Sequence, residues 1–116
     1  MELLEELKEM GADIRDGLKR FAGKDTLYIK MLKKFPEAAS GLEVMSYLES
    51  GQQEQALANA HTLKGMTGNL SLTPLYQGYT QIVALLRSDQ PEEAKRILEE
   101  ILPLQASMTA CIERNG

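Results

Sequence analysis

The chain has 116 residues, one histidine, one cysteine and a formal net charge of −4, and each of these features excludes a class of protein. A chain of this length makes a single domain, residues 1–116, and a helical bundle of that size can bury a core without disulfides or a structural metal. One histidine and one cysteine cannot make a conventional zinc site, and the negative charge argues against nucleic acid as the main partner.

Several other classes are excluded by the absence of their motifs. The chain has no Gly-rich phosphate loop, Walker motif or dinucleotide fingerprint, so any phosphoryl chemistry here does not start from bound ATP. No apolar run approaches the ~20 residues that a membrane span needs, and the acidic, periodic stretch from Met1 to Glu6 is wrong for a signal peptide. Cys111 has no cysteine to pair with. We therefore expect a cytoplasmic protein with no membrane contact and no metal or cofactor of its own.

Helical periodicity and helix-ending residues run along the whole chain, and no segment alternates with the period of a strand. Gly11 ends a first short helix and Asp13 caps a second. We expect these short helices, within residues 1–23, to lie across one end of a bundle. The predicted helices are residues 2–10, 14–21, 26–49, 53–69, 74–87 and 91–114.

The predicted helix at residues 26–49 contains two residues that weaken it. Asp25 is predicted to cap it. Pro36 deletes one intrahelical hydrogen bond and should kink or split the helix, and Gly41 weakens the following turn. We interpret this segment as one bent helix that ends at Ser50 and Gly51, with two shorter helices as the alternative.

The remaining helices begin at proline junctions. Thr73 is predicted as an N-cap with Pro74 at the first helical position, Pro91 begins the last helix, and Pro103 should kink that helix near its middle. Short connections force antiparallel neighbours, so residues 25–115 are predicted to form an all-α, antiparallel up-down-up-down four-helix bundle. Because aromatic residues are few, we interpret the methionines at positions 31, 45, 66 and 108 as core filler rather than as a partner groove.

The stretch from residue 58 to residue 70 holds the only histidine, His61, and two glycines, Gly65 and Gly68, inside a run that otherwise reads as helix. Each glycine costs a helix interior roughly 1 kcal/mol relative to alanine, so something must require a bare backbone there. His61 lies roughly 140° from the centre of the apolar stripe, so its imidazole should face solvent. That predicted core stripe consists of Ala56, Ala60, Leu63, Thr67 and Leu70.

The residues alone leave more than one interpretation open. His61 could be a surface histidine without a role, and Lys64, one turn along, could be an ordinary exposed lysine. The two glycines could serve close packing of this helix on a neighbour, or they could let a partner approach. We favour docking, because Gly65 and Gly68 lie on the His61 side of the helix.

A family resemblance adds to this interpretation. The signature of histidine-containing phosphotransfer domains, the HPt modules of multistep two-component phosphorelays, is similar to two runs of this chain: His61-Thr62-Leu63-Lys64-Gly65 and Gly68-Asn69-Leu70. The signature is specific because His, Lys and Gly fall at fixed offsets on one helix. Residues 11–35 also resemble the usual lead-in of bacterial members, so the resemblance covers almost the whole chain, more weakly at its C-terminal end.

The resemblance implies a phosphoryl carrier. His61 would accept a phosphoryl group from the aspartyl-phosphate of one receiver domain and pass it to another, and Lys64 would neutralise phosphate charge. The partners would be receiver domains of response regulators or hybrid histidine kinases, which would supply Mg²⁺. The implied docking surface consists of Leu57, Ala58, Gly65, Gly68 and Asn69.

The chain departs from the family pattern at two places. Family members usually carry glycine where this chain has Ser71, at the exit from the motif helix. A polar side chain on the following helix often orients the second imidazole nitrogen, but Val83 occupies one position where such a residue is expected. The candidates for contacts with the imidazole or the phosphate are Gln77, Thr80, Gln81 and Arg87.

Three other functions compete with the carrier. A helical adaptor that binds receiver domains without being phosphorylated is the main alternative. A dimerisation-type kinase helix usually has an acidic residue directly after its histidine, whereas Thr62 follows here. A histidine-dependent hydrolase would need a second acid-base residue at a motif spacing. We therefore expect a monomeric carrier that is not an enzyme.

Overall fold

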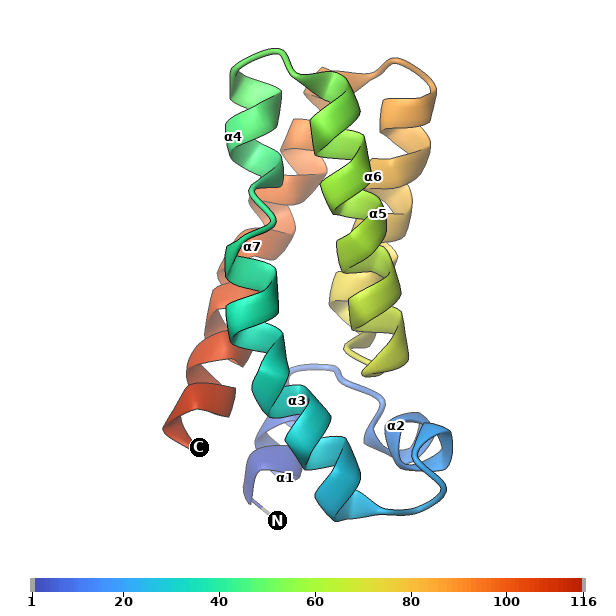
Figure 1. The fold of residues 1–116 in the computed structure, drawn as a ribbon, viewed down its shortest axis with the longest axis vertical. Coiled ribbons are helices and arrows are strands. Elements are labelled where there is room, and N and C mark those ends of the chain that lie inside the picture. Colours follow the sequence, from blue (N-terminus) through green and yellow to red (C-terminus); the bar gives the residue numbers. More distant parts are fainter. Residues whose placement is uncertain (1, 116) are drawn as a thin grey trace.

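The computed structural model describes residues 2–115, and every regular element in that range is an α-helix (Figure 1). This confirms the all-α class. No helix in the described range is long and apolar enough to cross a membrane. The helices are α1 (Glu2–Glu9), α2 (Ile14–Arg20), α3 (Asp25–Ser40), α4 (Val44–Glu49), α5 (Gln53–Asn69), α6 (Thr73–Arg87) and α7 (Pro91–Arg114).

The long helices run lengthwise through a molecule that measures 41 × 24 × 20 Å. Helix α5 packs on α6 and α6 packs on α7, while α3 packs on α7 and α4 packs on both α5 and α7. Figure 1 shows α1 and α2 together at the end of the molecule where α5 finishes and α3 begins. The short helices therefore close the end that carries the α5–α6 turn.

The apolar stripe predicted on α5 is buried, which fixes the orientation of this helix. Ala56, Ala60, Leu63, Thr67 and Leu70 are all in the core. The one polar member, Thr67, is satisfied locally, because its hydroxyl donates to the carbonyl of Leu63 at 2.8 Å. With this stripe turned inward, the opposite face of α5, which includes His61, is turned to solvent.

The prediction of one bent helix over residues 26–49 is wrong, and the two-helix alternative is correct. Helix α3 ends at Ser40 with Gly41 as its C-cap and α4 begins at Val44, whereas Pro36 lies inside α3 and does not split it. A proline removes a single hydrogen bond, which a well-packed helix tolerates. Gly41 is a poor helix former, and the hydroxyl of Ser40 donates to the carbonyl of Glu37 in the last turn of α3. Both features favour a helix end at this point.

Two predicted caps are displaced by one residue. Asp25 is the first residue of α3, where its carboxylate accepts the N–H of Thr26 at 2.7 Å, and Lys24 takes the cap position. Thr73 is likewise the first residue of α6, and the cap is Leu72. The side chain of Leu72 is fully buried, and its N–H donates to the carbonyl of Thr67 at the end of α5. These two contacts fix Leu72 at the cap position. Asp13 caps α2 as predicted, accepting the N–H of Asp16.

The last helix has the predicted bounds, and the four methionines differ in how deeply they are buried. Helix α7 continues through Pro103 to Arg114. Met108 is completely buried, whereas Met31 and Met66 are only half-buried and line a groove in the surface. Met31, Met45 and Met66 all pack against the core, so the interpretation as core filler agrees with the structure in part, although Met31 and Met66 also line the groove.

Three contacts hold α2 beside the end of α5, two of them through Tyr28 of α3. Gly17 faces the ring of Tyr28, and a Cβ atom at residue 17 would overlap that ring. The Tyr28 hydroxyl donates to the carbonyl of Leu70 at 2.7 Å, and the N–H of Asp13 donates to the carbonyl of Ser71 at 2.9 Å. These contacts place the charged side chains of α2 beside the last turn of the motif helix.

Candidate functional site

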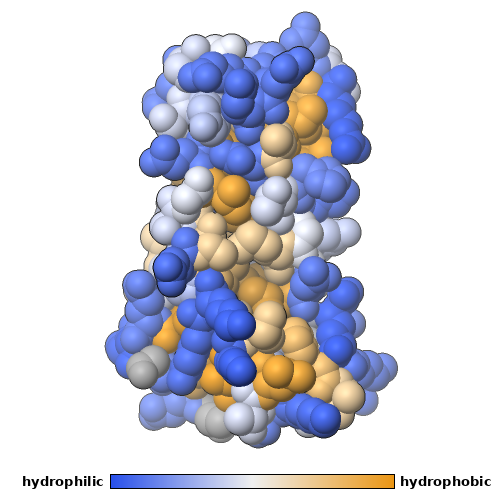
Figure 2. All heavy atoms as spheres, in the orientation of Figure 1, coloured by the Kyte–Doolittle hydropathy of each residue, from blue (hydrophilic) through white to orange (hydrophobic). Residues whose placement is uncertain are grey.

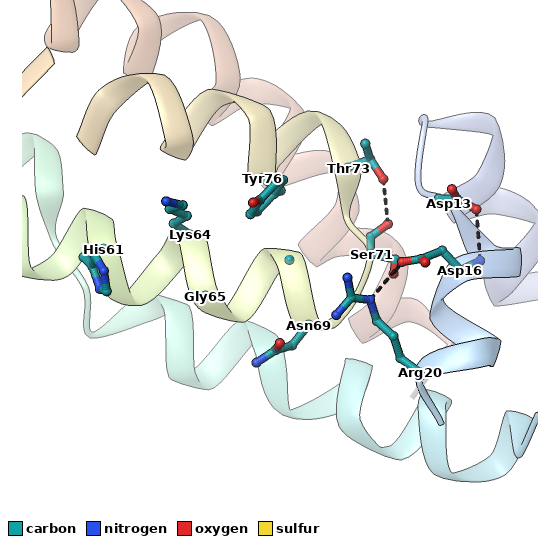
Figure 3. A pocket seen from close by; sticks show the side chains of 11 residues that line it. Asp13, Asp16, Arg20, His61, Lys64, Gly65, Asn69, Ser71, Thr73 and Tyr76 are labelled. Atoms are coloured by element: carbon teal, nitrogen blue, oxygen red, sulfur yellow. Dashed lines mark hydrogen bonds and ion pairs between the residues drawn. The ribbon is translucent and has the colours of Figure 1, made fainter. Parts of the chain in front are cut away.

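A groove of about 500 Å³ lies along the outer face of α5 and ends at α2 (Figure 3). Helix α5 contributes His61, Lys64, Gly65, Gly68 and Asn69. The other walls come from α2, from the α5–α6 turn and from the start of α6, and their residues are Asp13, Asp16, Arg20, Ser71, Thr73 and Tyr76. The structure thus brings five of the predicted site residues into one concave surface.

His61 is exposed in the middle of α5, on the face opposite the buried stripe. Neither ring nitrogen has a hydrogen-bond partner among residues 2–115. Because the ring has no bond that ties it to the fold, both nitrogens can meet an incoming group. An imidazole that is neutral near pH 7 is a competent nucleophile.

Lys64 and Gly65 follow His61 along the same face. Lys64 is partly buried and has no ion-pair partner in the described part of the chain, so its ammonium group is available to an external anion. A Cβ atom added at Gly65 would meet nothing within 4 Å. The bare backbone at Gly65 is therefore not required by internal packing, and the helix carries its cost for another reason.

Gly68 differs from Gly65, because α6 covers it. A Cβ atom at Gly68 would lie 2.9 Å from Cδ1 of Tyr76 and 3.0 Å from Cε1. In Figure 3 the Tyr76 side chain points from α6 toward α5 and lies between Lys64 and the α5–α6 turn. The ring is 39% exposed, so it forms part of the groove surface. Gly68 thus serves the packing of Tyr76, which is the alternative to direct docking raised by the sequence.

Ser71 ends α5 in the left-handed conformation, with φ of 55°. The N–H of Leu72 donates to the carbonyl of Thr67, and the N–H of Ser71 donates to that of Gly68. This pair of bonds is a Schellman ending, whose left-handed position favours glycine. The serine hydroxyl instead donates to Oδ2 of Asp16 at 2.7 Å, which ties the helix end to α2.

The two acidic side chains of the groove are at its α2 end, where Asp13 caps the helix and Asp16 is paired with Arg20. Arg20 Nε donates to Oδ2 of Asp16 at 2.8 Å, and this bond, followed by the one from Ser71, lowers the pKa of Asp16 below its ordinary 3.8. Asp16 is therefore a carboxylate at neutral pH, neutralised by Arg20. No acidic residue lines the groove beside His61 and Lys64, so that end presents only groups that suit an anion.

Six candidate residues do not line this groove. Leu57 is half-buried against the core, and Ala58 is exposed on the preceding turn of α5. The other four belong to α6, and none of them bonds to His61 in the described chain: Gln77, Thr80, Gln81 and Arg87. The Thr80 hydroxyl donates to the carbonyl of Tyr76, and Val83 is buried. Contacts between these side chains and a phosphorylated imidazole stay predictions.

Sequence reasoning did not identify the α2 side of the groove or Tyr76. Asp16 and Ser71 are 55 residues apart in the chain, and no local pattern predicts that they touch. One signal was present: Ser71 follows the end of the motif helix, at a position that is often left-handed and then favours glycine, so a serine there suggests that its side chain has a partner.

The described part of the chain holds no group of three or more His, Cys, Asp or Glu side chains placed to bind a metal. Comparison of the chain with protein-family models, with curated proteins and with solved structures finds no match. The chemistry must therefore be argued from the groove itself. Its central features are an exposed nucleophile, an adjacent unpaired cation and an uncovered helix backbone.

Proposed function

We propose that this protein is a phosphoryl carrier of the histidine-containing phosphotransfer type, and that His61 is the phosphorylated residue. The observation that carries the proposal is the arrangement on α5: an exposed imidazole with no hydrogen bond to residues 2–115, Lys64 one turn away, and the bare, uncovered backbone of Gly65 beside them. The similarity of this run to the HPt signature agrees with that arrangement.

The fold is compatible with the proposal. We interpret α3 with α4, α5, α6 and α7 as an antiparallel up-down-up-down four-helix bundle, with α1 and α2 across one end. A helix inside such a bundle is held rigidly along one side and leaves its outer face open to a partner. Rigid presentation matters, because phosphoryl transfer depends mainly on positioning and charge neutralisation.

The proposed reaction moves one phosphoryl group and needs no cofactor on this chain. A ring nitrogen of His61, most accessibly Nε2, attacks the phosphorus of an aspartyl-phosphate on a receiver domain. The N–P bond forms, the P–O bond to the aspartyl carboxyl group breaks, and the aspartate leaves as a carboxylate. The ring proton stays on the other nitrogen. The reverse reaction passes the group to a second receiver, and Lys64 balances phosphate charge in both directions.

Transfer from receiver domains tests the proposal. Isolated receiver domains, phosphorylated with labelled acetyl phosphate and then desalted, should pass the label to the wild-type chain. The bound label should be acid-labile and base-stable, as expected for phosphohistidine, and His61→Gln should carry none.

His61→Gln should also melt like the wild type, because an exposed substitution changes stability by no more than about 0.5 kcal/mol. A folded wild-type chain that binds receiver domains without acquiring label would support the adaptor alternative. Label retained by His61→Gln would place the phosphoryl group on another residue.

A further inference from the structure

Tyr76 is one of two large hydrophobic side chains that are exposed in the described part of the chain, and the other is Leu27 at the start of α3. Other apolar side chains at the surface are only partly exposed, as in the apolar band along the middle of the face drawn in Figure 2. Isolated exposed side chains of this kind are common, so exposure alone assigns no role. Position distinguishes the two residues, because Tyr76 lines the His61 groove and Leu27 does not.

The Tyr76 ring is seated on the bare backbone of Gly68. A Cβ atom at Gly68 would lie 2.9 Å from Cδ1 of the ring, so the ring occupies the space that a side chain on α5 would fill. Gly68 comes four residues after Lys64, and positions four apart are neighbours on one face of a helix. The ring therefore takes the place next to Lys64 on the side toward the C-terminal end of α5.

Lys64 is partly buried, although two of its neighbours on α5, Gly65 and Gly68, have no side chain to cover it. The cover comes from α6, which returns alongside α5 after the short turn at residues 70–72 (Figure 1). Both helices rise about 1.5 Å per residue, so the contact of Gly68 with Tyr76 puts Lys64 level with Thr80, one turn further along α6. Lys64 is thus flanked by α6 residues at its own level and on its C-terminal side.

The ring also separates the two ends of the groove. In Figure 3 the Tyr76 side chain lies between Lys64 and the α5–α6 turn, where the Ser71 hydroxyl donates to the carboxylate of Asp16. Lys64 has no ion-pair partner among residues 2–115. Because an ammonium group is attracted to a carboxylate, a lysine without this barrier would turn toward Asp16 and away from His61.

We infer that Tyr76 is a positioning residue for Lys64, and that its ring keeps the lysine ammonium group on the His61 side of the groove. Side chains on a helix lean toward its N-terminus, which is the direction from Lys64 to His61. The ring closes the opposite direction, so the ammonium group is held in advance where phosphate charge arrives. This inference rests on the part of the proposed function that places a phosphoryl group on His61.

Phosphoramidate, a small phosphoryl donor, tests the inference without a docked protein. Its phosphoryl group moves to a ring nitrogen of His61, the phosphorus–nitrogen bond of the donor breaks, and ammonia leaves. Lys64→Ala should slow this labelling by about tenfold, because the charge that balances the phosphate is lost. Tyr76→Ala should slow it by about threefold, and should have no further effect in the Lys64→Ala background.

Two further variants separate positioning from a general effect on the fold. Tyr76→Phe keeps the ring, so this conservative change should restore the rate. Leu27→Ala removes the other exposed large side chain, outside the groove, and is the matched control. Nuclear Overhauser contacts between the Lys64 methylene protons and the ring of residue 76 should be present in the wild type and in Tyr76→Phe, and thermal melts should show that every variant is folded.

Three results would overturn the positioning role while leaving phosphorylation of His61 intact: no Overhauser contact in the wild type, a wild-type rate in Tyr76→Ala, or an equal loss with and without Lys64. If phosphoramidate labels His61 with the expected dependence on Lys64 and Tyr76 but no receiver domain transfers to the wild type, the carrier function fails and the positioning role stands. If phosphoramidate does not label His61, both fail.

Discussion

At the scale of single residues, the two glycines of the motif helix have different surroundings. Gly65 faces open space, whereas Gly68 lies under the ring of Tyr76. The two glycines lie on the same face of α5 but have different roles. Gly65 leaves the backbone open, and Gly68 makes room for the Tyr76 side chain, which lines the groove.

Alanine substitution should separate these roles by stability. Gly65→Ala should raise the free energy of unfolding by about 1 kcal/mol, because alanine is the better helix former and its methyl group meets nothing. Gly68→Ala should gain less or lose stability, because its methyl group displaces the Tyr76 ring. In a Tyr76→Ala background Gly68→Ala should recover the full gain. Urea denaturation of the single and double variants measures this, and equal gains at both glycines would show that the ring imposes no constraint.

Ser71 is the second residue whose role depends on a distant contact. It occupies a left-handed position that costs a residue with a side chain about 1 kcal/mol or more relative to glycine, and its hydroxyl bonds to Asp16. Ser71→Gly removes both the strain and the bond, whereas Ser71→Ala removes only the bond. Ser71→Ala should therefore be the less stable variant, by about 1 kcal/mol. Thermal melts of the two variants check the order, and the reverse order would mean that the backbone at residue 71 is unstrained.

At the scale of the elements, α1 is fastened to the end of α7 by one carboxylate. Glu6 accepts hydrogen bonds from the thiol of Cys111 at 2.9 Å and from Arg114 at 2.7 Å. These two bonds, the thiol first, lower the pKa of Glu6 below its ordinary 4.5. Cys111 is fully buried, and burial together with Glu6 raises the pKa of its thiol to about 11, so it stays a neutral donor.

The fastening of α1 should depend on pH in one direction. Because the pKa of Glu6 is lower in the folded protein, the stability that its carboxylate contributes is complete above pH 4.5 and is lost as the pH falls through the lowered value. Glu6→Gln should melt at a lower temperature than the wild type near neutral pH, and the difference should shrink at acid pH. Melting curves of both proteins across this pH range test the prediction. If the difference in melting temperature does not change with pH, ionisation of Glu6 does not contribute to stability.

The helices themselves could be predicted where one signal dominates. The bounds of α5 and α7 follow from periodicity and from the residues at their ends, and the structure has them at Gln53–Asn69 and Pro91–Arg114. The segment between Asp25 and Ser50 contains two candidate breakers, Pro36 and Gly41. Local propensity cannot choose between them, because the choice depends on how α3 and α4 pack on other helices.

At the scale of the whole molecule, the site joins distant parts of the chain. The exposed face of α5, with His61, could be predicted from the position of the buried stripe alone. The α2 wall could not, because it depends on the contact between Asp16 and Ser71, which are 55 residues apart in the chain. Charge is also distributed unevenly along the chain: residues 15–34 carry seven basic side chains and two acidic ones, whereas α1 and α7 together carry nine glutamates and four basic residues.

The most direct test of the central claim follows one labelled phosphoryl group through the protein. A phosphorylated receiver domain is mixed with the chain, the chain is isolated and its label is located by peptide mass spectrometry, and an unphosphorylated receiver is then added. The account predicts that the label is found on the peptide containing His61 and moves to the second receiver, and that His61→Gln interrupts the passage at the first step. Label that reaches the second receiver through His61→Gln, or that is found on a different residue, would contradict the account.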